Sequence, residues 1–209
     1  KGEAMTEQTR ARGSYAKGVL RRSEILDAAL EVISECGGRG ALIGDIARRV
    51  GLTQAGLMHH FRSRDELFCA IIQARDEHDE ELFARAPVGI AGFIAVIEHN
   101  QQVPGLVQLF AEYSAEVAGD PRHPSRAFFR QRYAALREAL TGDVRIAQES
   151  GEMGSAACAP DIAEQMIVAA DGLQVQWLLD REVDMAGRLR QLWRALCAAS
   201  FDEDRGANT

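Results

Sequence analysis

The stretch LIGDIARRVGLTQAGLMHHF, residues Leu42–Phe61, predicts two short helices joined by a tight turn. Gly51 follows the first helix, where a chain that turns into the left-handed conformation favours a residue without Cβ. Thr53 can cap the second helix, because its hydroxyl can accept a hydrogen bond from a backbone N–H of the first turn. Polar and very small side chains then occupy the leading turn, as a reader of the DNA major groove requires. The stretch therefore predicts a helix-turn-helix whose partner is duplex DNA.

Both flanks of this motif are predicted to be helical. The upstream stretch RRSEILDAALEVISECG carries an apolar stripe at helical spacing, formed by Ile25, Ala29, Val32, Ile33 and Cys36. Downstream, Ser63 and Glu66 have the spacing of a capping box that opens another helix at about Asp65. The motif is therefore expected to be the second part of a three-helix head, followed by a connecting helix.

This order of elements resembles the tetracycline-repressor (TetR) family over about Arg21–Phe83, the first third of the chain. The resemblance implies an all-α protein, with an N-terminal three-helix DNA-binding head and a C-terminal helical bundle for ligand binding and dimerisation. It also implies a ligand-responsive transcriptional regulator, expected to be a repressor. Such a protein would bind a palindromic operator as a homodimer and be released by a small hydrophobic inducer.

The chain is expected to contain a flexible arm (1–19), the helix-turn-helix domain (20–64), the helical ligand-binding and dimerisation domain (65–201) and a flexible tail (202–209). Charge supports this division. Residues 1–64 hold 11 lysines and arginines against 7 acidic residues, a net +4, although the whole chain carries −7. A basic N-terminal part followed by an acidic remainder is typical of a protein that binds DNA phosphates with its N-terminal domain.

Seven residues are expected to contact DNA: Thr53, Gln54, Ala55, Gly56, His59, Arg64 and Arg48. The amide of Gln54 can pair bidentately with adenine, and Ala55 can touch a thymine methyl; an exposed helix glutamine is the alternative for Gln54. His59 would contact a base or a phosphate one turn further on. Arg64 matches a basic residue that touches phosphate in the family.

Two positions depart from the family pattern. Most relatives have a phosphate-binding threonine near Ile43 or Gly44, and a tyrosine where this chain has Met58. The resemblance therefore implies that two contacts with DNA are missing here.

Beyond the connecting helix (65–84), further helices are expected at 89–102, 105–117, 125–140 and 144–150, before two long C-terminal helices. An apolar inducer cavity would draw on aromatic, aliphatic and amide side chains of this region. The candidates are Phe93, Ile97, Gln101, Phe110, Tyr113, Phe129, Tyr133, Gln174 and Trp177. The alternative is that they form an ordinary core.

The two C-terminal helices each carry a stripe of large apolar residues. In the family, the equivalent pair forms a four-helix interface with its symmetry mate, although such helices could instead close the core. The expected interface residues are Met166, Leu173, Trp177, Leu189, Leu192 and Trp193.

Other chemistry is weakly represented in the sequence. The acidic run Asp76–Glu81 leaves one alternative open, an all-helical metal-binding protein or enzyme. Helical spacing spreads these groups around the axis, and no phosphate loop, nucleophile elbow or zinc spacing appears. We therefore expect no enzyme, catalytic residue, metal or cofactor. The longest apolar runs are too short to span a membrane, so the protein is expected in the cytoplasm without a membrane partner.

Overall fold

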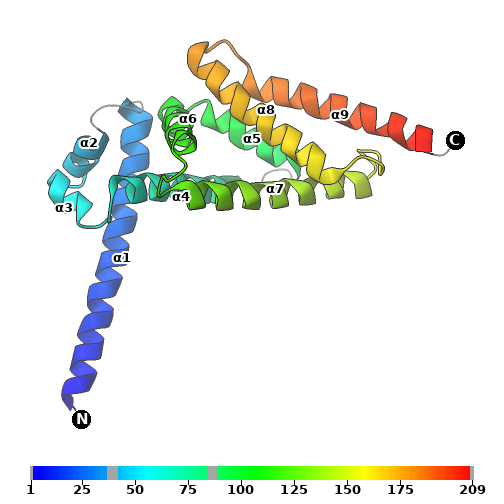
Figure 1. Cartoon of the computed structure of the whole chain (residues 1–209). Coiled ribbons are helices and arrows are strands. Elements are labelled where there is room, and N and C mark those ends of the chain that lie inside the picture. The colour runs from blue at the N-terminus through cyan, green and yellow to red at the C-terminus, as the bar shows by residue number, and fades with distance from the viewer. Residues whose placement is uncertain (1, 37–41, 84–88, 208–209) are drawn as a thin grey trace. The chain divides into compact units, whose positions relative to one another are not determined.

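The computed structural model describes residues 2–36, 42–83 and 89–207, and in these residues it is built from helices without strands. This confirms the expected all-α fold. In chain order the helices are α1 (Gly2–Cys36), α2 (Leu42–Arg49), α3 (Gln54–Met58), α4 (Arg64–Phe83), α5 (Ile90–Asn100), α6 (Pro104–Gly119), α7 (Arg126–Glu149), α8 (Ala159–Leu179) and α9 (Met185–Ala207) (Figure 1).

The chain divides into two compact units, Lys1–Glu77 and His78–Thr209, here called the head and the body. The division falls within α4, so this helix begins in the head. In the part of the chain that the structure describes, no helix is long and apolar enough to cross a membrane.

The core of the head is formed by the faces that the sequence predicts. Helix α1 contributes its apolar stripe and packs against α2, which also packs against α3. The first turns of α4 add further buried side chains. The fully or almost fully buried side chains are Ile25, Ala28, Ala29, Val32, Ile33, Ile46, Ala47, Leu57, Phe61, Leu67, Phe68, Ile71 and Ile72. The side chain of Cys36, also expected in this stripe, lies outside the described side chains.

Helix α1 is longer than the sequence analysis expected. Residues 1–19 were expected to form a flexible arm, whereas the helix begins at Gly2. Extending an existing helix requires no new nucleus, and the segment 3–12 is rich in Glu, Ala, Met, Gln and Arg, all good helix formers. The helix therefore extends well ahead of the apolar stripe that begins at Ile25.

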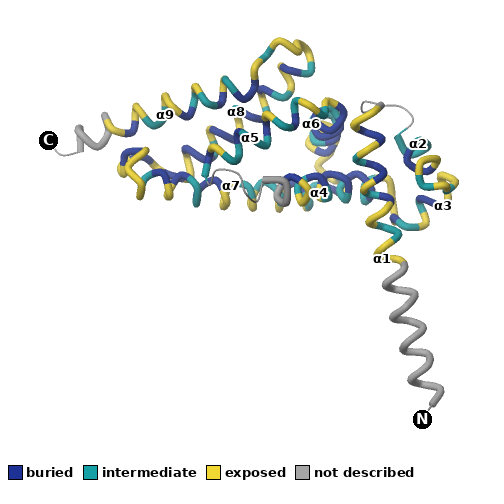
Figure 2. The backbone as a smooth tube through the Cα atoms, turned by 180° about the vertical axis from the view of Figure 1, so that it is seen from behind, coloured by how far each residue is buried: buried dark blue, intermediate teal, exposed yellow. Residues whose placement is uncertain are grey.

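The core of the body is built from α5 to α9. Helix α8 packs against both α7 and α9, and its buried residues recur along one side of the helix (Figure 2). They are Ala159, Ile162, Ala163, Met166, Ile167, Ala170, Leu173 and Trp177. A helix buried on one face in this way still presents its opposite face to a partner or to solvent.

Two expected boundaries in the body were wrong. The helices expected at 125–140 and 144–150 are one continuous helix, α7. Gly142 costs about 1 kcal/mol in a helix interior, but Leu140 and Val144 beside it are buried and hold the helix together. Helix α9 extends to Ala207, into the segment 202–209 that was expected to be a flexible tail.

The expected dimer-interface residues belong to this core. Met166 and Leu189 are fully buried, and Leu173, Trp177 and Trp193 are at most 9% exposed within one protomer. Leu192 is half-buried and packs against the same cluster. The apolar stripes of α8 and α9 thus help to close the core of the body within one protomer, which matches the alternative that the sequence left open.

Candidate nucleic-acid interface and ligand cavity

The turn between α2 and α3 has the geometry that the glycine requires. Gly51 has a φ of 68°, in the left-handed region where a side chain is strained. Its N–H donates to the carbonyl of Arg48 at 3.2 Å, and the N–H of Leu52 donates to the carbonyl of Ala47 at 2.8 Å. These two bonds satisfy the last carbonyls of α2 and reverse the chain within a few residues.

Thr53 caps α3, as expected. Its Oγ1 accepts a hydrogen bond from the N–H of Gly56 at 3.0 Å, and its backbone is extended. The cap fixes the direction of a five-residue helix, which is too short to hold itself together by helix propensity alone. The fully buried Leu57 anchors the same helix to the core of the head.

The outer face of α3 carries the expected base-reading residues. Gln54, Ala55 and His59 are exposed and Gly56 is half-buried. The side chain of Gln54 folds back over α2, where a Cβ on residue 44 would lie only 2.9 Å from Gln54 Nε2. Gly44 therefore leaves the room in which the Gln54 amide rests.

The arginines of α2 differ in what they contact. Arg49 forms ion pairs with Glu31 and Glu35 on α1, so its charge is already partnered within the head. Arg48 is 76% exposed and pairs with Asp45 of its own helix at 2.7 Å. Exposed pairs of this kind contribute little stability. Of the two arginines, Arg48 can therefore more easily exchange its carboxylate partner for a DNA phosphate.

Helix α4 begins with the expected capping box. Ser63 Oγ accepts a hydrogen bond from the N–H of Glu66 at 3.1 Å, and the Glu66 carboxylate accepts one from the N–H of Arg62 at 2.8 Å. These contacts hold the pKa of Glu66 below its usual value, the backbone bond from Arg62 being the main cause. The cap places Arg64 on the exposed first turn, with its guanidinium 4.6 Å from the centre of the Phe68 ring.

Two arginines that sequence reasoning did not assign tie α1 to the motif. Arg21 donates to the carbonyl of Val50 at 2.6 Å, and Arg22 donates to the carbonyl of His60 at 2.9 Å. The Arg22 guanidinium also lies 4.2 Å from the centre of the Phe61 ring. The adjacent arginines at the start of the apolar stripe were the available signal, but their partners depend on the tertiary fold.

The body contains a cavity of about 740 Å³ between α6, α7 and α8. Of the expected ligand residues, Phe110, Phe129, Tyr133 and Gln174 line it. The others do not line this cavity: Phe93, Ile97, Gln101, Tyr113 and Trp177. Ile97 and Trp177 are core residues, against which Phe93 packs, and Gln101 reaches the carbonyl of Val183 at 3.5 Å.

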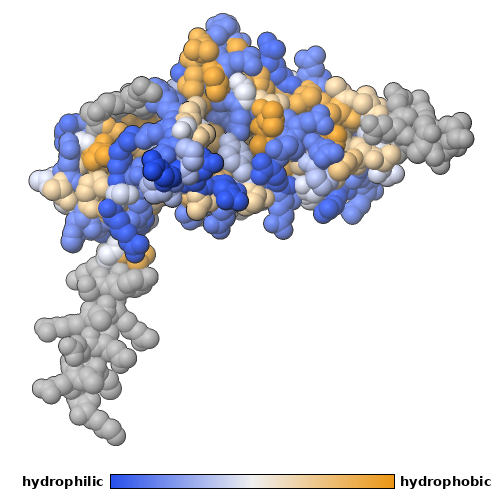
Figure 3. Space-filling model, in the orientation of Figure 1, coloured by the Kyte–Doolittle hydropathy of each residue, from blue (hydrophilic) through white to orange (hydrophobic). Residues whose placement is uncertain are grey.

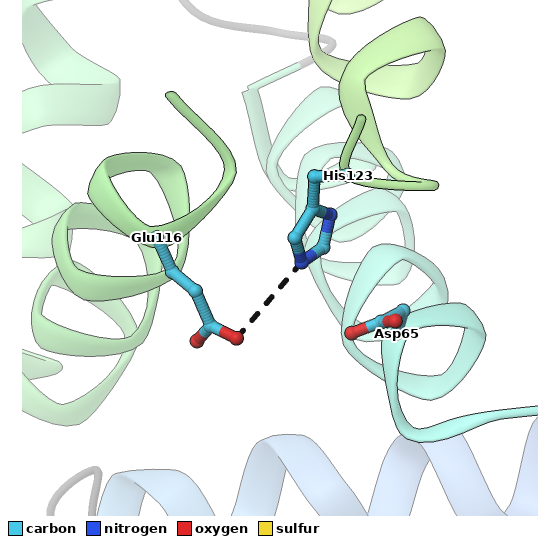
Figure 4. A group of neighbouring side chains, drawn as sticks. All are labelled: Asp65, Glu116 and His123. Carbon is cyan, nitrogen blue, oxygen red and sulfur yellow. Dashed lines mark ion pairs between the residues drawn. The ribbon is translucent and has the colours of Figure 1, made fainter. Parts of the chain in front are cut away.

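Tyr113 belongs to the corner between α6 and α7 rather than to the cavity. It is 1% exposed, and its hydroxyl forms a 2.6 Å hydrogen bond with Ser125 Oγ. Its ring meets that of His123 edge-on at 5.8 Å, and His123 Nε2 lies 3.9 Å from Glu116 Oε1 (Figure 4). These contacts fix the corner, which sets how far apart α6 and α7 stand at this end.

A polar pair closes the wall of the cavity at α8. Tyr133 donates its hydroxyl hydrogen to Asp171 Oδ2 at 2.7 Å. Burial raises the pKa of the Asp171 carboxyl, an effect that the Tyr133 bond opposes. Sequence reasoning missed Asp171, although it is the only charged residue between Glu164 and the end of α8; an acid within an apolar stretch is a usable signal for a functional side chain.

Comparisons with known protein families cover both units. Residues 25–71 match the bacterial regulatory proteins of the tetR family, and residues 91–202 match the C-terminal domain of BetI-type transcriptional repressors. The second match alone extends over more than half of the chain. These matches do not support the alternative of a metal-binding protein or enzyme that uses the acidic run Asp76–Glu81.

Individual relatives agree with the family matches. The nucleoid occlusion factor SlmA of Marinobacter nauticus is 30% identical over 137 residues, which are 64% of this chain and 69% of that protein. The transcriptional regulator UidR of Escherichia coli is 28% identical over 69% of this chain and 72% of its own length. The crystal structure of a TetR-family regulator from Rhodococcus has a TM-score of 0.65 at 20% identity, over 85% of this chain and 98% of that one.

Proposed function

Because the chain belongs to the TetR family of bacterial regulatory proteins, we propose that it acts in the cytoplasm as a homodimeric repressor. It is a ligand-responsive DNA-binding transcriptional regulator. In the proposed cycle the dimer binds a palindromic operator and releases it when a small hydrophobic molecule enters the body. The observation that carries the proposal is the capped, outward-facing α3 on a glycine turn.

In this proposal α3 enters the major groove and its exposed face reads the operator. Gln54 contacts a base edge, while Ala55 and Gly56 allow close approach to the groove wall. Thr53, His59, Arg48 and Arg64 contact phosphates or flanking bases. Residues 1–64 carry the net positive charge that phosphate contacts require, so we expect binding to weaken steeply with salt as counterions are released.

The proposed dimer uses the outer face of α8, which the core does not occupy. Val168, Val175 and Leu179 are 61%, 53% and 86% exposed, although they are large and apolar. Their spacing places them on one side of the helix, and hydrophobic side chains gather over α8 and α9 in Figure 3. A second copy would cover this stripe, and two heads would then read a palindrome.

The role of Gln54 can be separated from that of a phosphate contact. We expect Gln54→Ala to cost about 1–3 kcal/mol on the cognate operator and to relax one base position, because one edge contact is lost. We expect Arg64→Ala to weaken cognate and random duplexes alike and to reduce the salt slope by about one. Fluorescence anisotropy with both duplexes at several salt concentrations measures this. Equal losses for Gln54→Ala on both duplexes would reassign it to a non-specific role.

Gly44→Ala tests whether the resting place of Gln54 competes with DNA. A Cβ at residue 44 would push against the far end of the Gln54 side chain, which can move at little cost. The fraction of molecules in which the Gln54 side chain is displaced from α2 and can contact a base then increases. We therefore expect operator affinity to rise about two- to fivefold. The helix should gain up to about 1 kcal/mol in stability.

The matched control is the double change Gly44→Ala with Gln54→Ala, in which the gain in affinity should vanish. Weaker operator binding by Gly44→Ala alone, with Gln54 intact, would show that the folded-back side chain does not compete with DNA.

A further inference from the structure

The ligand cavity of the body has an uneven charge distribution. Among the described residues that line it, Asp171 is the only acid. Three arginines also contribute to its walls: Arg126, Arg130 and Arg137. Which of these charges can act on a ligand therefore depends on which groups already form ion pairs or hydrogen bonds within the protein.

Two of the arginines are committed elsewhere. Arg137 forms an ion pair with Glu164 through two hydrogen bonds. Arg126 donates to the carbonyls of Val117 and Ala118 at 3.5 and 3.4 Å, at the end of α6. Arg130 is exposed, and lies one turn of α7 from Tyr133.

For Asp171, in contrast, the hydrogen-bond donor among the described residues of the cavity wall is neutral: the hydroxyl of Tyr133. The carboxylate is partly removed from water in a cavity whose other walls are mainly apolar. Arg132 acts on it through its charge, but the guanidinium of Arg132 lies over the Phe110 ring, 4.8 Å from its centre. A charged carboxylate in such surroundings gains from a cation that enters with a ligand.

We infer that the ligand of this cavity carries a protonated amine on an apolar body, with the ammonium group donating to Asp171. The rings of Phe110, Phe129 and Tyr133 line the cavity beside it and offer both apolar surface and the π faces that attract organic cations. The inference rests on the proposed ligand-responsive function and names the chemical class of its ligand.

The charge of Asp171 also predicts a pH dependence. Burial raises the pKa of this carboxyl, the Tyr133 bond and the charge of Arg132 lower it, and the charge of Glu164 raises it. Protonation removes the partner of the ammonium group. The affinity for an amine should therefore fall as the pH is lowered through the pKa of Asp171, while the affinity for a neutral analogue stays constant.

Titration calorimetry on the whole chain, without DNA, tests the inference with three probes that share one body: phenylbutylamine, phenylbutanol and phenylbutyrate. We expect the amine to bind about tenfold more tightly than the alcohol, as a charge-assisted hydrogen bond predicts, and the carboxylate to bind most weakly. Asp171→Asn should bring the amine to within about twofold of the alcohol. The matched control is Asp161→Asn, at an exposed acid on the first turn of the same helix, which should keep the preference.

Equal binding of the amine and the alcohol would overturn the inference, and so would tightest binding of the carboxylate, which would assign the ligand to Arg130. If the Asp171→Asn chain binds neither the amine nor the alcohol, the pH dependence of amine binding by the unmodified chain tests the inference instead. An affinity for the amine that does not fall at low pH would then overturn it. Because no DNA is present, failure here is distinct from failure of the proposed function. An amine that binds through Asp171 but leaves operator binding unchanged would contradict the proposed release of the operator by the ligand. It would not contradict the chemical class assigned to the ligand.

Discussion

Leu189→Glu is expected to unfold the body rather than to split a dimer. Leu189 is fully buried in the cluster that α9 shares with α5, α7 and α8. The change removes a buried leucine and places a carboxylate in its position, and each of these effects costs several kcal/mol. We expect a loss of about 4 kcal/mol or more in the free energy of unfolding, a large part of the total stability of a typical domain.

Denaturant unfolding followed by circular dichroism measures this loss. The matched control is Gln191→Glu, which introduces the same side chain at an exposed position of the same helix and should change stability by less than about 0.5 kcal/mol. A Leu189→Glu chain that unfolds at the same denaturant concentration as the unmodified chain but sediments as a monomer would contradict this prediction. It would place Leu189 in the dimer interface.

The second large effect is expected on the outer face of α8. Val168→Glu combined with Leu179→Glu leaves the core of the body untouched, because both side chains are mainly exposed in one protomer. In a two-fold interface each change acts twice, so four carboxylates would meet across the axis. We expect monomers at micromolar concentration and a loss of about a hundredfold or more in operator affinity, since the heads are no longer linked.

Sedimentation and operator titration on the same preparation measure both consequences. Ile146→Glu is the matched control: it places the same side chain on an apolar residue that is 47% exposed on α7 rather than on α8, so we expect dimer and operator binding to persist. A double variant that remains dimeric and binds the operator normally would place the interface elsewhere.

The head could be predicted closely because its signals are local. A positive-φ glycine, a capping threonine and apolar stripes each act within a few residues, so Gly51, Thr53 and Ile33 take the places that their order along the chain predicts. The folded-back position of Gln54 could not be predicted, since it depends on the missing Cβ of Gly44 on another helix.

The body was harder to predict because helical periodicity identifies a buried face but not what buries it. The stripe through Leu173 and Leu189 is equally consistent with a partner and with a core, and only the packing of α5 and α7 decides between them. The role of Asp171 depends on its hydrogen bond with Tyr133, 38 residues away along the chain, which no local pattern predicts. The cavity itself depends on the spacing of α6 and α7, which the buried Tyr113–Ser125 hydrogen bond helps to set.

The most direct measurement for DNA reading by the head is selection of bound fragments from genomic DNA by the purified chain, alongside its Gln54→Ala variant. The enriched fragments are expected to share a short inverted repeat, with half-sites about one helical turn apart, and the variant should lose discrimination at one position of each half-site. Enriched fragments without a shared inverted repeat would contradict a dimer that reads its operator through α3.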